Sequence, residues 1–121
     1  MTVRILYVDD EDDIREVAAM ALELDPGFEV RDCGSGRDAV ALAAEWRPDL
    51  ILLDVMMPEM DGPATLQRLR AQDETADTPV AFITARAGRD DAERLATLGA
   101  CGVVAKPFDP MTLATQVRAL L

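Results

Sequence analysis

The fold is decided by the stretch Val3-Arg4-Ile5-Leu6-Tyr7-Val8-Asp9-Asp10, a short apolar run that ends in two carboxylates. Similar runs, rich in Val, Ile and Leu and with little polar alternation, lie near residues 28–31, 49–53, 79–83 and 102–105. Strands that are buried on both faces show this pattern, and they belong to parallel sheets that helices cover. The sequence therefore predicts five parallel strands at these places, the first of them over residues 3–8.

A segment with helical signals follows each run. The first segment carries apolar residues on one helical face: Ile14, Val17, Ala18, Ala21 and Leu22. Ser35 and Asp38 have the spacing of a capped helix start, and Pro63 suits the first residue of the third helix. A fourth helix over residues 89–98 ends at Gly99, which suits a left-handed cap.

The last helix is predicted to begin at Asp109-Pro110 and to turn four apolar side chains inward: Leu113, Val117, Leu120 and Leu121. Alternating strands and helices with short connections predict an α/β fold, a flavodoxin-like (βα)5 three-layer sandwich with strand order 2-1-3-4-5. A chain of 121 residues has room for one domain. We expect a single domain over residues 1–121, with no output domain.

Composition and charge narrow the classes of function. The net charge of −11 disfavours binding to nucleic acid and to anionic membranes. No apolar run approaches the ~20 residues of a membrane span. Because the first strand begins at Val3, we expect no signal peptide. We therefore expect a cytoplasmic protein whose Cys33 and Cys101 are free thiols. The absence of histidine excludes Ser-His-Asp and Cys-His catalysis, and any phosphohistidine must belong to another molecule.

Five polar residues stand where four of the predicted strands end: Asp9, Asp10, Asp54, Thr84 and Lys106. Ligands of such sheets bind outside the carboxyl ends of the strands, so these side chains are predicted to converge. Clustered carboxylates favour a hard cation such as Mg²⁺, and a lysine ammonium suits a phosphate oxygen. No serine, threonine or cysteine has a base beside it, and no glycine-rich phosphate loop is present. The candidate nucleophile is therefore the carboxylate of Asp54.

The chain resembles the receiver domains of two-component response regulators, which are CheY-like, over its whole length. Four motifs in family order and spacing carry this resemblance: Val8-Asp9-Asp10-Glu11, Asp54-Val55-Met56-Met57-Pro58-Glu59-Met60-Asp61-Gly62, Thr84-Ala85 and Lys106-Pro107-Phe108. It implies a phosphoryl-accepting signalling switch that is not an enzyme, except that it catalyses its own phosphorylation and dephosphorylation. The partners implied are a histidine kinase or histidine phosphotransferase and an unknown downstream protein, with a monomer or a phosphorylation-dependent dimer.

The resemblance also implies a role for each site residue. Asp54 accepts the phosphoryl group, and Thr84 and Lys106 contact the phosphoryl oxygens. Mg²⁺ is held by four groups: Asp9, directly or through water, Asp10, Asp54 and the backbone carbonyl of Met56. The Lys106-Pro107 bond is expected to be cis, and Gly62 to permit a turn that brings the loop back over the site.

One residue departs from the family pattern. Many receivers carry an aromatic ring or a histidine where Val103 stands, and that ring turns inward when the threonine moves. Valine is short and stiff at χ1, so it cannot fill that space. Signalling through the fourth helix, fifth strand and fifth helix must then take another form.

Other functions and roles stay open at this point. Two other classes of protein share the predicted fold. One is the pseudo-receiver, which is an interaction module that never carries phosphate, and the other is a flavodoxin-like cofactor carrier. Glu11 has two possible roles: its negative charge either interacts favourably with the dipole at the start of the first helix, or it contacts the metal. Met57 and Met60 are expected to pack their loop while Met56 lines the site, and Trp46 to anchor the second helix or to lie partly exposed.

Overall fold

The computed structural model describes residues 2–121. In chain order its elements are β1 (Val3–Val8), α1 (Asp12–Leu22), β2 (Phe28–Cys33), α2 (Gly36–Trp46), β3 (Leu50–Asp54), α3 (Gly62–Ala71), the single 3₁₀ turn η1 (Asp73–Thr75), β4 (Val80–Thr84), α4 (Arg89–Thr97), β5 (Gly102–Ala105) and α5 (Leu113–Arg118).

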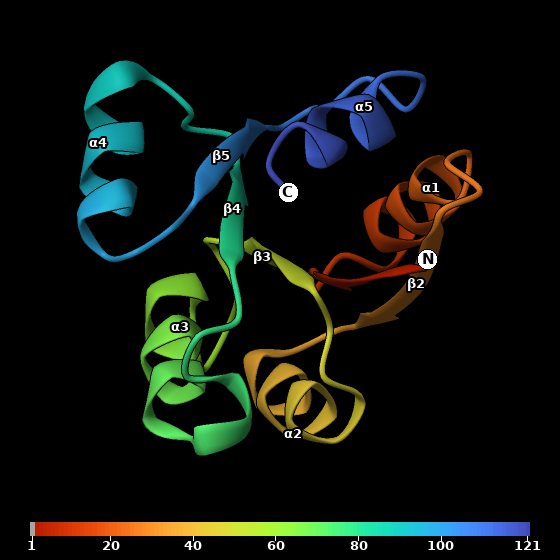
Figure 1. Cartoon of the computed structure of the whole chain (residues 1–121). Helices are drawn as coiled ribbons and strands as arrows, with labels where there is room; N and C mark the ends of the chain where they lie inside the picture. The colour runs from red at the N-terminus through yellow and green to blue at the C-terminus, as the bar shows by residue number, and fades with distance from the viewer. Residues whose placement is uncertain (1) are drawn as a thin grey trace.

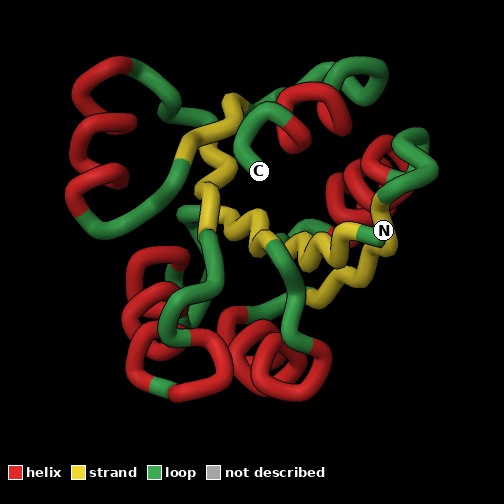
Figure 2. Tube along the Cα trace, viewed as in Figure 1, coloured by secondary structure: helices red, strands yellow, loops and turns green. Residues whose placement is uncertain are grey.

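The strands form one parallel sheet in the order β2-β1-β3-β4-β5, which confirms the predicted topology. Figure 2 shows the strands at the centre of the molecule with the helices around them. β3 and β4 are buried along their whole length. Their continuous apolar sequence follows from this position, because helices cover both faces of the sheet.

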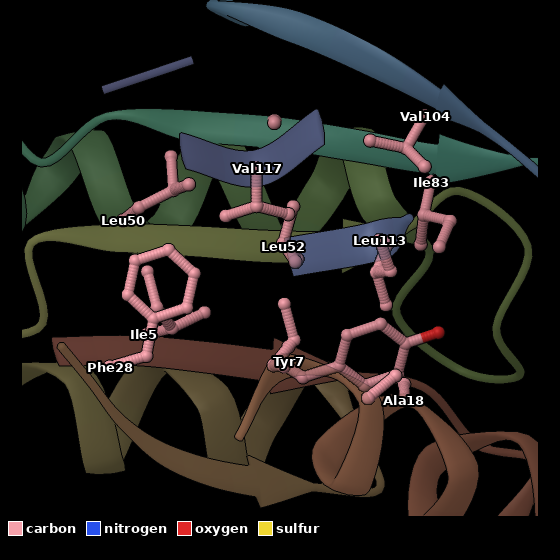
Figure 3. Close-up of a cluster of buried hydrophobic side chains, with 13 residues drawn as sticks. Ile5, Tyr7, Ala18, Phe28, Leu50, Leu52, Ile83, Val104, Leu113 and Val117 are labelled. Atoms are coloured by element: carbon pink, nitrogen blue, oxygen red, sulfur yellow. The ribbon is translucent and has the colours of Figure 1, made fainter. Parts of the chain in front are cut away.

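The helices divide between the two faces of the sheet. α1 and α5 lie side by side on one face, and α2, α3 and α4 cover the other (Figure 1). Each face has its own apolar core, and Figure 3 shows the core beneath α1 and α5, where Leu113 and Val117 meet strand residues such as Leu52. Trp46, 6% exposed, packs in the other core and anchors the end of α2, which is the first of its two predicted roles.

Several local predictions are confirmed. The Ser35 hydroxyl accepts a hydrogen bond from the Asp38 N–H at the start of α2, and Gly99 has a φ of 103° beyond α4. Met57 is buried in its loop, and both cysteines are free thiols. No helix in the described part of the chain has the length and apolar character that a bilayer crossing requires.

Other predicted details are wrong. Val17 is 44% exposed and Leu121 is 52% exposed, so neither faces the core. The apolar stripe of α1 that meets the sheet is narrower than the periodicity suggested, and it consists of Ala18, Ala21 and Leu22. α5 begins at Leu113 because residues 110–112 form a turn, in which the Asp109 carboxylate accepts a hydrogen bond from the Met111 N–H.

Gly62, the first residue of α3, brings the loop after β3 back against the strand. Its N–H donates to the Val55 carbonyl at 2.9 Å. A Cβ atom at this position would lie 2.6 Å from the carbonyl oxygen of Asp54 and 2.8 Å from the Cα of Val55. Because both obstacles are backbone atoms, only glycine fits without moving the end of β3.

We expect Gly62→Ala to lower the free energy of unfolding by about 1–3 kcal/mol, the usual cost of overpacking a buried position. Chemical denaturation measures this loss. Gly88→Ala is the matched control, because the nearest atom to its added Cβ would be a carboxylate oxygen of Asp91, 4.0 Å away. The control should lose much less stability, because its only expected cost is the weaker capping of α4 by alanine. Equal losses in the two variants would contradict the steric argument.

Candidate functional site

Four strands deliver the candidate side chains to one edge of the sheet. Asp54 is the last residue of β3 and Thr84 the last of β4, whereas Asp9 and Lys106 directly follow β1 and β5. The register pairs Asp54 with Ile83 and Thr84 with Ala105, so the strands end at nearly the same level. The carboxyl ends of neighbouring parallel strands thus place these groups together, as the sequence predicts.

Asp9 is fully buried and holds three hydrogen-bond donors on its carboxylate. Its Oδ1 accepts from the Glu11 N–H at 3.0 Å. Its Oδ2 accepts from the Tyr7 hydroxyl at 3.0 Å and lies 2.8 Å from the Lys106 ammonium. A buried carboxylate without such partners would cost several kcal/mol, so this set of donors is what permits the burial.

The Lys106 ammonium lies between two buried carboxylates. Its Nζ is 2.8 Å from Oδ2 of Asp9 and 3.2 Å from Oδ2 of Asp54, and its side chain is only 11% exposed. The Lys106-Pro107 peptide bond is cis, as the resemblance implied. Burial lowers the pKa of Lys106, but the hydrogen bond to Asp9 and the charges of Asp54 and Asp9 outweigh it and raise that pKa above its usual value. The ammonium is therefore charged and neutralises the cluster.

Asp54 combines burial with a negative neighbour. Its pKa is raised from the ordinary value of 3.8 to about 6, first by burial and then by the charge of Asp9, while Lys106 lowers it. The Met56 N–H donates to Oδ1 of Asp54 at 3.3 Å. Ionisation of Asp54 therefore costs free energy in the folded chain. A further positive group beside Asp54 would lower that cost.

The hydroxyl of Thr84 lies at the end of β4, and the residue is 5% exposed. Its Oγ1 accepts a hydrogen bond from the Arg86 N–H at 3.0 Å, so the hydroxyl hydrogen stays available for another acceptor.

The Met56 side chain is 77% exposed. It projects from the loop that follows Asp54.

The carboxylates that converge are those of Asp9, Glu11 and Asp54, whose oxygen atoms lie within 4.8 Å of one another. Asp10 is exposed and does not belong to this group. The Glu11 carboxylate lies 3.6 Å from the Lys106 ammonium, although its side chain is 60% exposed. Hard oxygen donors at this spacing fit a cation such as Mg²⁺. Of the two roles that the sequence left open for Glu11, its position in the cluster favours contact with a metal. Tyr7 is a further residue of the site that no sequence motif indicated.

The pKa of Asp54 makes the stability of the metal-free protein depend on pH. The folded chain binds more protons than the unfolded chain between about pH 3.8 and pH 6, so stability falls as pH rises through this interval. Asp54→Asn removes the effect. In EDTA at pH 7 we expect it to raise the free energy of unfolding by up to about 3 kcal/mol, and the gain should disappear near pH 4.

Chemical denaturation at both pH values measures this difference. Asp77→Asn, which alters an exposed carboxylate before β4, is the control and should have little effect at either pH. A gain for Asp54→Asn of equal size at pH 4 and pH 7 would show that ionisation of Asp54 does not cause it.

Comparison with known proteins gives a consistent result. Residues 5–118 match the response regulator receiver domain family. The DNA-binding dual master transcriptional regulator RpaA of Synechocystis is 40% identical over 118 residues, which are 98% of this chain and 48% of that protein. The phosphate regulon transcriptional regulatory protein PhoB of Pseudomonas aeruginosa is 38% identical over 117 residues, 97% of this chain and 51% of that protein.

The chain thus spans about half the length of these curated relatives. Among solved structures, the chemotaxis response regulator CheY4 of Vibrio cholerae has a TM-score of 0.90 and 33% sequence identity, and each chain is covered over 100% of its length. The family match covers nearly the whole chain, and the matched region contains all the residues of the site. This chain therefore belongs to the family of response regulator receiver domains.

Proposed function

We propose that this chain is a phosphoryl-accepting signalling switch of a two-component phosphorelay, in which Asp54 receives the group from a histidine kinase or a histidine phosphotransferase. One observation carries the proposal. The Lys106 ammonium lies 2.8 Å from the Asp9 carboxylate and 3.2 Å from the Asp54 carboxylate, at the carboxyl edge of the sheet. A buried nucleophile, a mobile positive charge and the Thr84 hydroxyl are the groups that such a transfer requires.

The transfer is a displacement at phosphorus. A carboxylate oxygen of Asp54 attacks the phosphorus of the donor's phosphohistidine, a P–O bond forms and the P–N bond breaks. The electron pair of the P–N bond stays on the imidazole nitrogen, which takes up a proton from solvent. The ammonium of Lys106 and the hydroxyl of Thr84 bind the phosphoryl oxygens as negative charge arrives. The chain catalyses no reaction beyond its own phosphorylation and dephosphorylation.

A divalent cation completes the proposed site. We assign Mg²⁺ to the carboxylates of Asp9, Asp10 and Asp54 and to the backbone carbonyl of Met56. The cation would supply positive charge for the phosphoryl oxygens. Glu11 is the competing ligand, because its carboxylate rather than that of Asp10 lies beside Asp9 and Asp54.

The proposed output is a change in the face formed by α4, β5 and α5, which a downstream protein recognises. Val103 and six other residues line a pocket of about 240 Å³ between α4 and β5: Ala87, Ala92, Ala96, Ala100, Cys101 and Gly102. Of the residues of α4, all of which are described, only Leu95 is buried. Because α4 buries so few side chains, it can move when Thr84 turns toward the phosphoryl group. This movement needs no aromatic ring at the position of Val103. We place this switch in the cytoplasm, as a monomer or a phosphorylation-dependent dimer.

Acetyl phosphate with Mg²⁺ should add one phosphoryl group to the chain, and mass spectrometry after borohydride trapping should locate it on Asp54. Asp54→Asn should abolish the label because it removes the nucleophile. Asp61→Asn is the matched control from the same loop, since asparagine replaces aspartate well as the cap of α3. The control should be labelled like the unmodified chain. An unlabelled native chain would instead identify a pseudo-receiver.

The metal assignment predicts a stability gain. A cation that binds only the folded chain stabilises it by about 2.7 kcal/mol at 100 times its Kd. Thermal melting with and without MgCl₂ should show this gain in the unmodified chain and a much smaller one in Asp10→Asn. Glu11→Gln should keep most of the gain. The opposite result for these two variants would transfer the ligand role from Asp10 to Glu11.

A further inference from the structure

Tyr7 is a fully buried residue of β1 that carries a polar group to the edge of the site. Its ring packs in the core beneath α1 and α5, and its hydroxyl oxygen points toward the carboxyl ends of the strands (Figure 3). The hydroxyl donates to Oδ2 of Asp9 at 3.0 Å. A phenylalanine would fill the same space in the core, so packing alone does not explain the hydroxyl.

The donors around Asp9 differ in how firmly they are held. A carboxylate offers about four lone-pair sites, and three donors occupy them here. The Glu11 N–H belongs to the backbone, and the Tyr7 hydroxyl is fixed by its buried ring. The third donor, Lys106, is a flexible side chain that also contacts Asp54. Lys106 is therefore the only one of the three that can leave Asp9 without a rearrangement of the fold.

We propose that Tyr7 is a positioning residue of the phosphoryl-acceptor site, an inference that rests on the proposed function. When Lys106 turns from Asp9 to a phosphoryl oxygen, Oδ2 of Asp9 loses its 2.8 Å partner. The Tyr7 hydroxyl stays on the same oxygen, so the buried carboxylate keeps its direction and one hydrogen bond. Without the hydroxyl, Oδ2 would depend on Lys106 alone, and Asp9 would hold the ammonium back.

The backbone of Asp9 is fixed independently of Tyr7. The Arg15 guanidinium donates to the Asp9 carbonyl at 2.8 Å and is itself held by Asp12 and Asp32. Loss of the Tyr7 hydroxyl therefore leaves the main chain of Asp9 in place and affects only the direction of its carboxylate. Outer hydrogen bonds of this kind orient the groups that bind a metal, and their removal commonly weakens metal affinity by about 10–100-fold.

Tyr7→Phe tests the proposal, because it deletes one oxygen atom and keeps the ring. Calorimetric titration with MgCl₂ should show about tenfold weaker binding, at the lower end of the range for such groups. At saturating Mg²⁺, labelling by acetyl phosphate should still be several-fold slower. Thr75→Val is the matched control, because it removes a buried hydroxyl that donates to the Leu69 carbonyl at the opposite edge of the sheet. It should alter the melting temperature but neither Mg²⁺ binding nor labelling.

A second pair of variants shows whether Tyr7 acts through Asp9. In an Asp9→Ala background, adding Tyr7→Phe should leave the Mg²⁺ affinity unchanged, because the hydroxyl no longer has its carboxylate. An equal loss in both backgrounds would overturn the proposal, as would normal Mg²⁺ binding and labelling in Tyr7→Phe alone. Those results would leave the proposed function intact. An unmodified chain that neither binds Mg²⁺ nor accepts label would overturn both.

Discussion

The site depends on one ammonium group that lies between two buried carboxylates. Lys106 follows the edge strand β5, and β4 separates β5 from the strand that ends in Asp54. Its long side chain must therefore extend past the end of β4 to reach Asp54 and Asp9. Two carboxylates this close repel each other by several kcal/mol at the effective dielectric of a protein, and the lysine offsets that repulsion. The ammonium reaches the two carboxylates because of the strand order, the shortness of β5 and the turn that follows it.

The strand pattern could be predicted well because each strand is a short apolar run with a polar residue at its end. The bounds of β1 and β5 agree with the structure. β3 and β4 each lie one residue later than predicted, so that they end at Asp54 and Thr84, and β2 continues to Cys33. Backbone pairing continues at these residues regardless of side-chain polarity. A prediction from apolar character alone therefore ends the strand too early. The exposure of Val17 and Leu121 had a similar origin, since periodicity shows a helical face but not how much of it the sheet covers.

The residue types of the site could be read from the sequence, but their directions could not. Successive side chains at a strand end point to opposite sides, so Asp9 is buried and Asp10 is exposed. The chain then turns into α1 and carries Glu11 back toward Lys106. Nothing in the order Asp-Asp-Glu reveals which carboxylates converge. The role of Tyr7 could not be predicted for a related reason. Within an apolar run its ring indicates only a core position, and the sequence does not show which group its hydroxyl contacts.

The light packing of α4 has an energetic consequence. One buried leucine ties this helix to the sheet, so a shift of the helix exposes little apolar surface and costs little free energy. Coupling between two sites in a protein commonly amounts to about 1–3 kcal/mol, which would be too small to rearrange a densely packed element. The pocket of about 240 Å³ beside α4, lined mainly by alanines, leaves space for such a shift. Each methyl group added to the alanines that line this pocket would then reduce the space into which the helix can shift.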